Sequence, residues 1–195
     1  MDKLTAIRRP VEQELTAYKE LFDAALAHED DFLGQALDYV RRRQGKMMRP
    51  LLVVLMAKEL GKVSVNSLRS AVTLELLHTA SLVHDDVVDE SDERRGQSSV
   101  NAMMTNQIAV LVGDYILSRS LHHAALTGSP EIVSAVAMLG QTLADGELQQ
   151  LANLDSEDID EVSYYSVVRK KTSSLFAACA QLGVMAAGGS TEQAE

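Results

Sequence analysis

The chain has 195 residues, 46% of them hydrophobic, which suits one domain with a sizeable core. Its formal net charge of −10 argues against nucleic acid and anionic membrane surfaces as partners. The sequence has no apolar run of roughly 18 residues that could span a membrane, no signal-peptide core at its start, and a single cysteine, Cys179. We therefore expect a cytoplasmic protein with no membrane span, in which this cysteine is a small buried residue.

Apolar side chains recur at three- and four-residue steps through the first sixty residues, which predicts three helices. The second should end in Arg41-Arg42-Arg43, since cations suit a helix C-terminus, and Pro50 suits the first turn of the third. Lys46 and Arg49 therefore lie at a loop-to-helix junction, where the helix N-terminus favours anions. They indicate either a phosphate site or a solvated basic turn. The expected helices cover residues 11–28, 30–43 and 50–60.

Acidic residues end the next predicted helix, which covers about residues 65–90. Asp85 and Asp89 are four positions apart and so share one helix face. Two such carboxylates can share Mg2+, which proteins usually hold with one or two carboxylates and substrate phosphate oxygens. Asp86 lies about 100° round the helix and could reach the same ion from the side.

Groups that suit phosphate lie close to these acids. Arg94 and Arg95 follow the helix, and the donor fork of a guanidinium matches phosphate oxygens. His78 lies seven residues, or two turns, before Asp85 and shares its face. The combination predicts a diphosphate bridged by Mg2+. The alternative is a solvated surface, which is the usual state of an acidic run at a helix end.

Small side chains precede the acids on the same helix face. A hydrocarbon tail that runs from a diphosphate at Asp85 would pass Leu77, Ala80 and Ser81. Bulky residues one turn below the diphosphate would stop such a tail, whereas Ala80 and Ser81 would let it pass. These positions predict a pocket for a long product. The alternative is that they only permit close helix packing.

Three further helices are expected, and they contain other polar candidates. Asp114 falls inside an apolar pattern, so we expect a buried acid with a cationic or helix N-terminal partner. His122 and His123 end that segment and are expected at the surface. Gly140 and Gly146 indicate close approach of another helix or a ligand. The helices cover about residues 99–126, 131–153 and 160–187.

The last of these helices carries Lys171 and Thr172 before its most apolar part. The lysine either snorkels to the surface or binds a diphosphate. Glu147 and Gln150 share a face of the preceding helix and either point into a cavity or form an ordinary polar face. Because no strand alternation, internal repeat or linker is evident, the sequence predicts one all-α helical domain over residues 1–195.

Five motifs follow one another along the chain: Gly45-Lys46-Met47-Met48-Arg49-Pro50, Asp85-Asp86-Val87-Val88-Asp89 with Arg94-Arg95-Gly96, Gly113-Asp114-Tyr115, Gly146-Glu147 with Gln150, and Lys171-Thr172. In order and spacing they resemble those of the trans-prenyltransferases, the polyprenyl diphosphate synthases. The resemblance extends from about residue 4 to residue 189. It implies a helical bundle of the isoprenoid synthase type, a homodimer, and Mg2+-dependent condensation of isopentenyl diphosphate with an allylic diphosphate.

The resemblance also implies a role for each site residue. The metal would be held by Asp85, Asp86 and Asp89. The catalytic residues would be Asp85, Asp89, Arg94 and Lys171. The substrates would be bound by Lys46, Arg49, His78, Arg94, Arg95, Lys171 and Thr172. Product length would depend on Leu77, Ala80 and Ser81.

One departure from the family pattern concerns a second aspartate-rich motif, which follows the Lys-Thr pair in the family and holds further Mg2+. The acidic run at residues 155–160 precedes that pair, and the sequence to Glu195 contains no such motif. We therefore expect the N-terminal part of a longer enzyme, without the last helices of the bundle, or a natural short form, with little synthase activity on its own and a tendency to associate. The other readings are a non-catalytic partner subunit and a helical scaffold with solvated charges.

Overall fold

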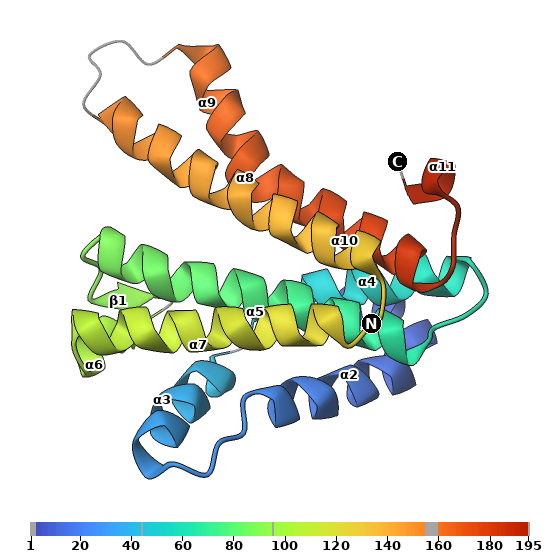
Figure 1. Ribbon diagram of the computed structural model, residues 1–195, viewed down its shortest axis with the longest axis horizontal. Coiled ribbons are helices and arrows are strands. Elements are labelled where there is room, and N and C mark those ends of the chain that lie inside the picture. Colours follow the sequence, from blue (N-terminus) through green and yellow to red (C-terminus); the bar gives the residue numbers. More distant parts are fainter. Residues whose placement is uncertain (1–2, 44, 95, 155–159, 195) are drawn as a thin grey trace.

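Helix α5 (Val65–Val88) is the element around which the other helices pack in the computed structural model, which describes residues 3–43, 45–94, 96–154 and 160–194. It contacts α2 (Glu12–Ala25), α4 (Met48–Glu59), α7 (Asn106–Ala125) and α10 (Ser174–Ala186), and it lies between several of them in Figure 1. A helix that is apolar on most of its circumference needs such all-round burial. The acids at its C-terminal end therefore extend from the best-packed element of the fold.

The remaining helices are shorter or lie further from this centre. The predicted helices are confirmed to within a few residues at most ends, and short helical segments are added at both ends of the chain. The additional elements are α1 (Lys3–Arg8), η1 (Arg9–Val11), α3 (Asp31–Arg42), α6 (Val100–Met103), α8 (Pro130–Leu154), α9 (Glu161–Val168), η2 (Arg169–Ser173) and α11 (Thr191–Ala194).

The prediction of a chain without strands is wrong at one place. Strands β1 (Glu93–Arg94) and β2 (Gln97–Ser98) form an antiparallel ribbon directly after α5. Gly96, in the turn between them, has a φ of +76°, which residues other than glycine rarely adopt. Strands of two residues are too short to show an alternating pattern in the sequence.

The helix predicted over residues 99–126 is interrupted at Met104. The Ser99 hydroxyl accepts a hydrogen bond from the Ala102 N–H at 3.3 Å and caps α6, and the Thr105 hydroxyl accepts one from the Ile108 N–H at 3.2 Å and caps α7. Two N-caps six residues apart favour two helices over one, because each hydroxyl satisfies N–H groups at a new helix start.

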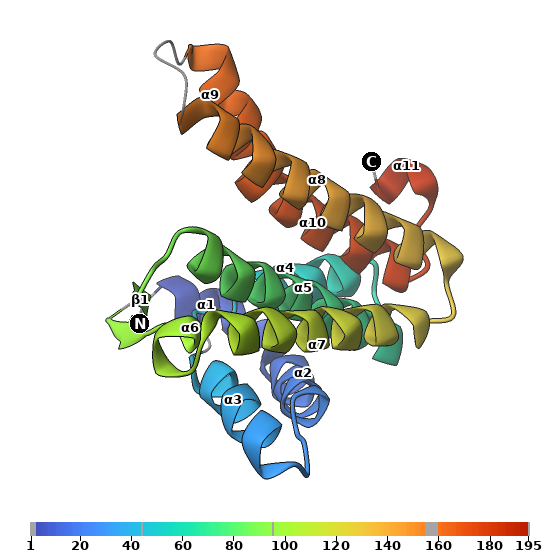
Figure 2. The same cartoon turned by 60° about the vertical axis from the view of Figure 1, so that its left-hand side comes forward.

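The last predicted helix is likewise interrupted, by the π-helical turn η2 between α9 and α10. Gly146 of α8 faces this turn, and a Cβ atom at that position would lie 2.7 Å from Lys170 Cβ and 3.0 Å from Lys171 Cγ. The predicted close approach at Gly146 is thus confirmed, whereas Gly140 has no atom within 4 Å of the equivalent position. The ends of α8 and α9 project as an arm from the rest of the molecule (Figure 1, Figure 2).

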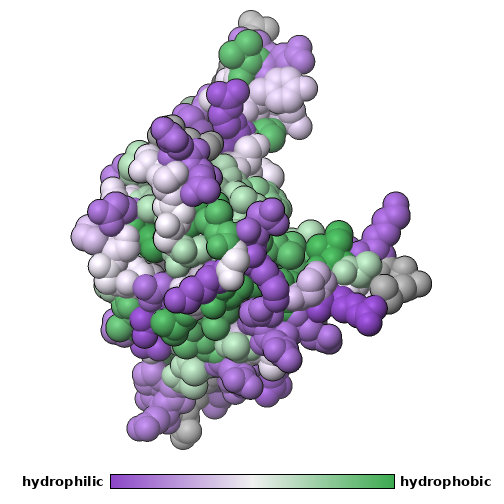
Figure 3. All heavy atoms as spheres, turned by 90° about the vertical axis from the view of Figure 1, so that its right-hand side faces the viewer, coloured by the Kyte–Doolittle hydropathy of each residue, from purple (hydrophilic) through white to green (hydrophobic). Residues whose placement is uncertain are grey.

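The core beneath these helices is formed by large apolar side chains from most of the chain. The largest fully buried ones include Tyr18, Phe22, Leu74, Ile116 and Leu182. Burial of one such side chain contributes roughly 1.5–3 kcal/mol to folding. In the space-filling view, apolar residues gather over the middle of one side, while hydrophilic residues cover its outer parts (Figure 3). No helix in the described parts of the chain is long and apolar enough to cross a membrane.

Three polar residues of this framework test predictions made from the sequence. Cys179 is fully buried, as expected, and burial raises the pKa of its thiol to about 12. His123 is only 5% exposed, so its expected surface position is wrong. Asp114 was expected to be buried, but its side chain is 60% exposed, and its partner is the His84 imidazole, with Nε2 3.3 Å from Oδ1. The apolar residues next to Asp114 in the sequence therefore do not imply that Asp114 itself is buried.

Candidate active site

A cavity of about 650 Å³ lies beside α5 and collects basic side chains from separate parts of the chain. Four predicted phosphate ligands line it: Lys46, Arg49, His78 and Arg94. Arg42 and Arg43, which were expected only as cations at a helix end, line the same cavity. We call it the cationic pocket. Its walls come from α3, α4, α5, the β1–β2 ribbon and α10, so it exists only in the folded chain.

The loop that carries Lys46 has an unusual backbone. Met47, which precedes the first residue of α4, has φ 49° and ψ 40°, in the left-handed region. A non-glycine residue there indicates local strain, which is common at ligand-binding sites. The Arg8 guanidinium donates a hydrogen bond to the Lys46 carbonyl and so connects α1 to this loop. Met47 packs against the core as expected, whereas Met48 is 43% exposed and lines the pocket.

Arg49 is held in the pocket wall by two neighbours. Its Nη1 lies 3.7 Å from a carboxylate oxygen of Glu75, and its guanidinium lies over the ring of Phe176, 5.8 Å from the centroid. The Nε atom of Arg49 is buried without a hydrogen-bond partner among the described residues. A buried donor in that state favours an acceptor from a ligand or a water molecule.

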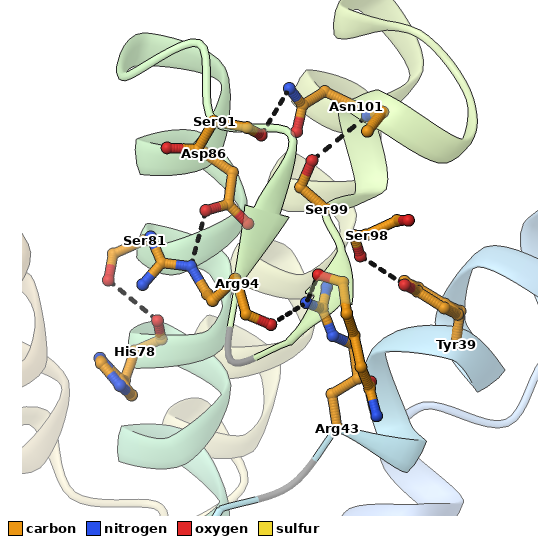
Figure 4. Close-up of polar contacts among 12 residues, drawn as sticks. Tyr39, Arg43, His78, Ser81, Asp86, Ser91, Arg94, Ser98, Ser99 and Asn101 are labelled. Atoms are coloured by element: carbon orange, nitrogen blue, oxygen red, sulfur yellow. Dashed lines mark hydrogen bonds and ion pairs between the residues drawn. The ribbon is translucent and has the colours of Figure 1, made fainter.

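Arg94 and Asp86 form an ion pair at the edge of the pocket (Figure 4). Arg94 Nε donates to Asp86 Oδ1 at 2.6 Å, and Asp86 is 2% exposed. The predicted role of Asp86 as a metal ligand therefore competes with this contact in the structure. The terminal nitrogens of Arg94 are separate donors, so a guanidinium anchored through Nε can still contact phosphate.

Asp85 and Asp89 lie at the end of α5, and neither lines the cationic pocket. Asp89 is the C-cap of the helix, and its N–H donates to the Asp85 carbonyl at 2.8 Å. Burial raises the pKa of the Asp85 carboxyl to about 6, the Glu147 carboxylate adds to that shift, and the Lys171 ammonium opposes it. The side chains of Asp85 and Asp89 have no hydrogen bond or ion pair to any other described residue.

Lys171 extends from the π-helical turn toward α8. Its ammonium forms an ion pair with Glu147 and donates to Gln150 Oε1 at 3.0 Å, so Glu147 and Gln150 face Lys171. π-Helical turns often occur at functional sites, because the inserted residue changes the direction of its neighbours. Thr172 is exposed and, with Lys171, lines a separate hollow of about 320 Å³.

The donor set beside α5 fits Mg2+. The described residues contain no group of three or more side chains that could hold a metal ion by themselves. Mg2+ does not require such a cage, because it is usually bound by one or two carboxylates together with phosphate oxygens and water. The Asp85 carboxyl is partly buried and its pKa is raised although the Lys171 ammonium opposes the shift, so a bound cation would favour its charged form. Asp85 and Asp89 would hold that ion.

The other predicted positions are less informative. Arg95 lies outside the described residues. Leu77 and Ala80 are 5% and 1% exposed and belong to the packed core, whereas Ser81 is half-buried and its hydroxyl donates to the His78 carbonyl at 2.9 Å. None of these three lines the cationic pocket. Their role in product length stays a prediction.

The chain is similar in sequence to known proteins. Residues 30–195 match the polyprenyl synthetase family. An octaprenyl diphosphate synthase from Haemophilus influenzae is 42% identical over 170 residues, which are 87% of this chain and 52% of that protein. The corresponding enzyme from Escherichia coli is 39% identical over 155 residues, 80% of this chain and 48% of that protein. The chain thus spans about half the length of the curated relatives it matches.

A solved structure has the same arrangement of helices. A polyprenyl synthase from Caulobacter crescentus, in complex with calcium and isoprenyl diphosphate, superposes with a TM-score of 0.93 at 26% identity. The match covers 98% of this chain and 58% of that one. The all-α fold predicted from the sequence is confirmed by this comparison.

Proposed function

Because the chain belongs to the polyprenyl synthetase family, we propose that it carries the isopentenyl diphosphate site and the first metal-binding face of a prenyltransferase. The observation that supports this most is the cationic pocket, which gathers Lys46, Arg49 and Arg94 in a protein of net charge −10. Like charges brought together in a partly buried cavity repel one another. An anionic ligand with several oxygens would relieve that repulsion.

Five residues of the pocket have a proposed task in holding isopentenyl diphosphate. Lys46 supplies a mobile point charge, and Arg49 supplies a planar fork already oriented by Glu75 and Phe176. Arg94, anchored on Asp86, supplies further donors from the opposite edge. Met48 and Phe176 are the exposed apolar residues of the lining and would flank the hydrocarbon part.

The allylic diphosphate would bind on the other side of α5, toward α8. Asp85 and Asp89 would hold Mg2+, which stabilises negative charge on a diphosphate leaving group. Lys171 would exchange its contact with Glu147 for a phosphate oxygen and add positive charge there. His78 lies two turns along the same helix and lines the pocket for the second substrate, so the two substrates would meet beside α5.

The proposed reaction needs no side-chain nucleophile. The C–O bond of the allylic diphosphate breaks, the double bond of isopentenyl diphosphate attacks the resulting allylic cation head-to-tail, and a proton leaves to the released diphosphate. A long product and a homodimer, both implied by the family resemblance, remain proposals, as does a cytoplasmic location. A non-catalytic partner subunit would not need residues that bind substrate or metal. The sequence nevertheless contains Lys46, Arg49, Asp85 and Asp89, which favours the enzyme.

The proposal is tested by titrating isopentenyl diphosphate into the chain in a calorimeter. Lys46→Ala removes one exposed pocket cation and should weaken binding about tenfold, the loss expected for a charge-assisted contact to phosphate. Lys62→Ala removes one exposed cation outside the pocket and should change affinity less than about twofold. Equal effects of the two substitutions, or no binding by the wild type, would contradict the proposal.

A further inference from the structure

The β1–β2 ribbon places Arg94 at the edge of the cationic pocket, yet it is too short to be stable alone. Each strand has two residues, with Glu93 opposite Ser98 and Arg94 opposite Gln97. Isolated two-stranded hairpins are marginal in water even when they are longer. Contacts from outside the ribbon must therefore fix its position.

Two side chains from the end of α3 make such contacts (Figure 4). Arg43 Nη2 donates to the Arg94 carbonyl at 2.9 Å and to the Gln97 carbonyl at 3.1 Å. One nitrogen thus joins both strands at the paired residues that close the turn. The Tyr39 hydroxyl donates to the Ser98 carbonyl, one residue further along β2.

The two side chains also support each other. The Arg43 guanidinium lies over the Tyr39 ring, 5.0 Å from its centroid, and Tyr39 packs against the core. A stacked guanidinium that already donates to two carbonyls has fewer donors free for phosphate. Arg43 therefore differs from Arg42, which is exposed, lines the same pocket, and makes no hydrogen bond or ion pair to another described residue through its side chain.

We propose that Arg43 and Tyr39 are positioning residues that hold the ribbon so that Arg94 faces the bound diphosphate. The inference rests on the proposed function and adds to it a clamp from α3. Asp86 fixes the Arg94 side chain from α5 at 2.6 Å, while from the opposite side Arg43 holds the Arg94 carbonyl and Tyr39 holds the Ser98 carbonyl of β2. The competing role for Arg43 is that of one more phosphate ligand.

The two roles are separated by binding of isopentenyl diphosphate to five variants of the full chain. Arg43→Ala should weaken binding about tenfold, as expected for a lost charge-assisted hydrogen bond. Tyr39→Phe, which removes one hydroxyl outside the pocket and no charge, should weaken it about threefold. Arg42→Ala removes a pocket charge without a contact to the ribbon, so it measures how much of the loss in Arg43→Ala is due to charge alone. Arg43→Ala combined with Arg94→Ala should be no weaker than Arg94→Ala alone, because coupled residues are not additive.

Hydrogen exchange of the ribbon amides without ligand gives a second readout. Faster exchange at residues 93, 94, 97 and 98 in both Arg43→Ala and Tyr39→Phe, with Arg42→Ala unchanged, supports the clamp. The clamp is overturned if Tyr39→Phe binds and exchanges like the wild type while the effects of Arg43→Ala and Arg94→Ala add. If the wild-type chain binds no isopentenyl diphosphate, the proposed function fails, and the exchange result alone decides whether Arg43 and Tyr39 hold the ribbon.

Discussion

The Asp85 carboxylate opposes folding at neutral pH. Its ordinary pKa of 3.8 is raised to about 6 by burial and by the Glu147 carboxylate. The folded state therefore binds a proton more tightly than the unfolded state. Below pH 3.8 the carboxyl is neutral in both states, and between pH 3.8 and 6 folding becomes less favourable as the pH rises.

Removal of this charge should therefore stabilise the metal-free protein. At pH 7.5 in EDTA, Asp85→Asn should raise the free energy of unfolding by roughly 1–3 kcal/mol, and at pH 3.5 it should change little. Urea denaturation at the two pH values measures both numbers. Asp89→Asn is the control, because Asp89 is exposed and loses the same charge. A destabilising effect of Asp85→Asn at both pH values would contradict this account of Asp85.

His123 should make the fold sensitive to acid. Burial lowers the pKa of its imidazole from 6.5 to about 4, and the Arg119 charge adds to the effect. Between these values the unfolded state binds the proton more tightly, so stability should fall by up to roughly 3 kcal/mol as the pH drops from 6.5 to 4. His123→Gln should flatten the curve of unfolding free energy against pH, and His122→Gln, at the exposed neighbour, should leave it unchanged. Equal curves for the two variants would exclude His123 as the cause.

At the scale of secondary structure, Gly146 and Gly140 form a natural pair of test positions on α8. Gly146→Ala places a Cβ 2.7 Å from Lys170 Cβ, so α8 and η2 must separate and Lys171 must move. We expect a loss of about 1–3 kcal/mol in unfolding free energy, the usual cost of overpacking. Gly140→Ala has open space and should be neutral or stabilise by up to about 1 kcal/mol. Thermal denaturation compares them, and a neutral Gly146→Ala would show that η2 tolerates displacement.

The elements also show which features a sequence can predict. The helices and the core follow from apolar spacing, and the cationic pocket was anticipated in Lys46, Arg49 and Arg94, whose charges are unusual in an acidic chain. The ribbon was missed because its strands are too short to form a pattern. Arg43 was interpreted as a cation at a helix C-terminus, and only the folded structure places it against the Arg94 and Gln97 carbonyls. The interruption between α6 and α7 could have been predicted from Thr105, because its hydroxyl caps α7. The apolar pattern continues across this position and gave no sign of it.

At the scale of the whole molecule, α5 separates two faces with different chemistry. The cationic pocket lies on the side of α3, α4 and the ribbon, whereas the Asp85 carboxyl lies outside it and close enough to Glu147 of α8 and Lys171 of η2 for their charges to act on its pKa. An allylic cation formed between them would have to be kept from water, and the sequence contains no second aspartate-rich motif. Low turnover by this chain alone therefore stays a prediction. Substrate binding can be measured separately from turnover.

The most direct test of the central claim is calorimetric binding of an allylic diphosphate, farnesyl diphosphate, with Mg2+ and with EDTA. We expect binding that needs Mg2+, weakens about tenfold or more in Asp85→Asn, as expected for a lost metal ligand, and persists in Asp114→Asn, whose exposed carboxylate pairs with His84. Such a result would establish Asp85 as part of a metal–diphosphate site. Binding that is equal with Mg2+ and EDTA, or that is absent altogether, would contradict the account and favour a helical scaffold with solvated charges.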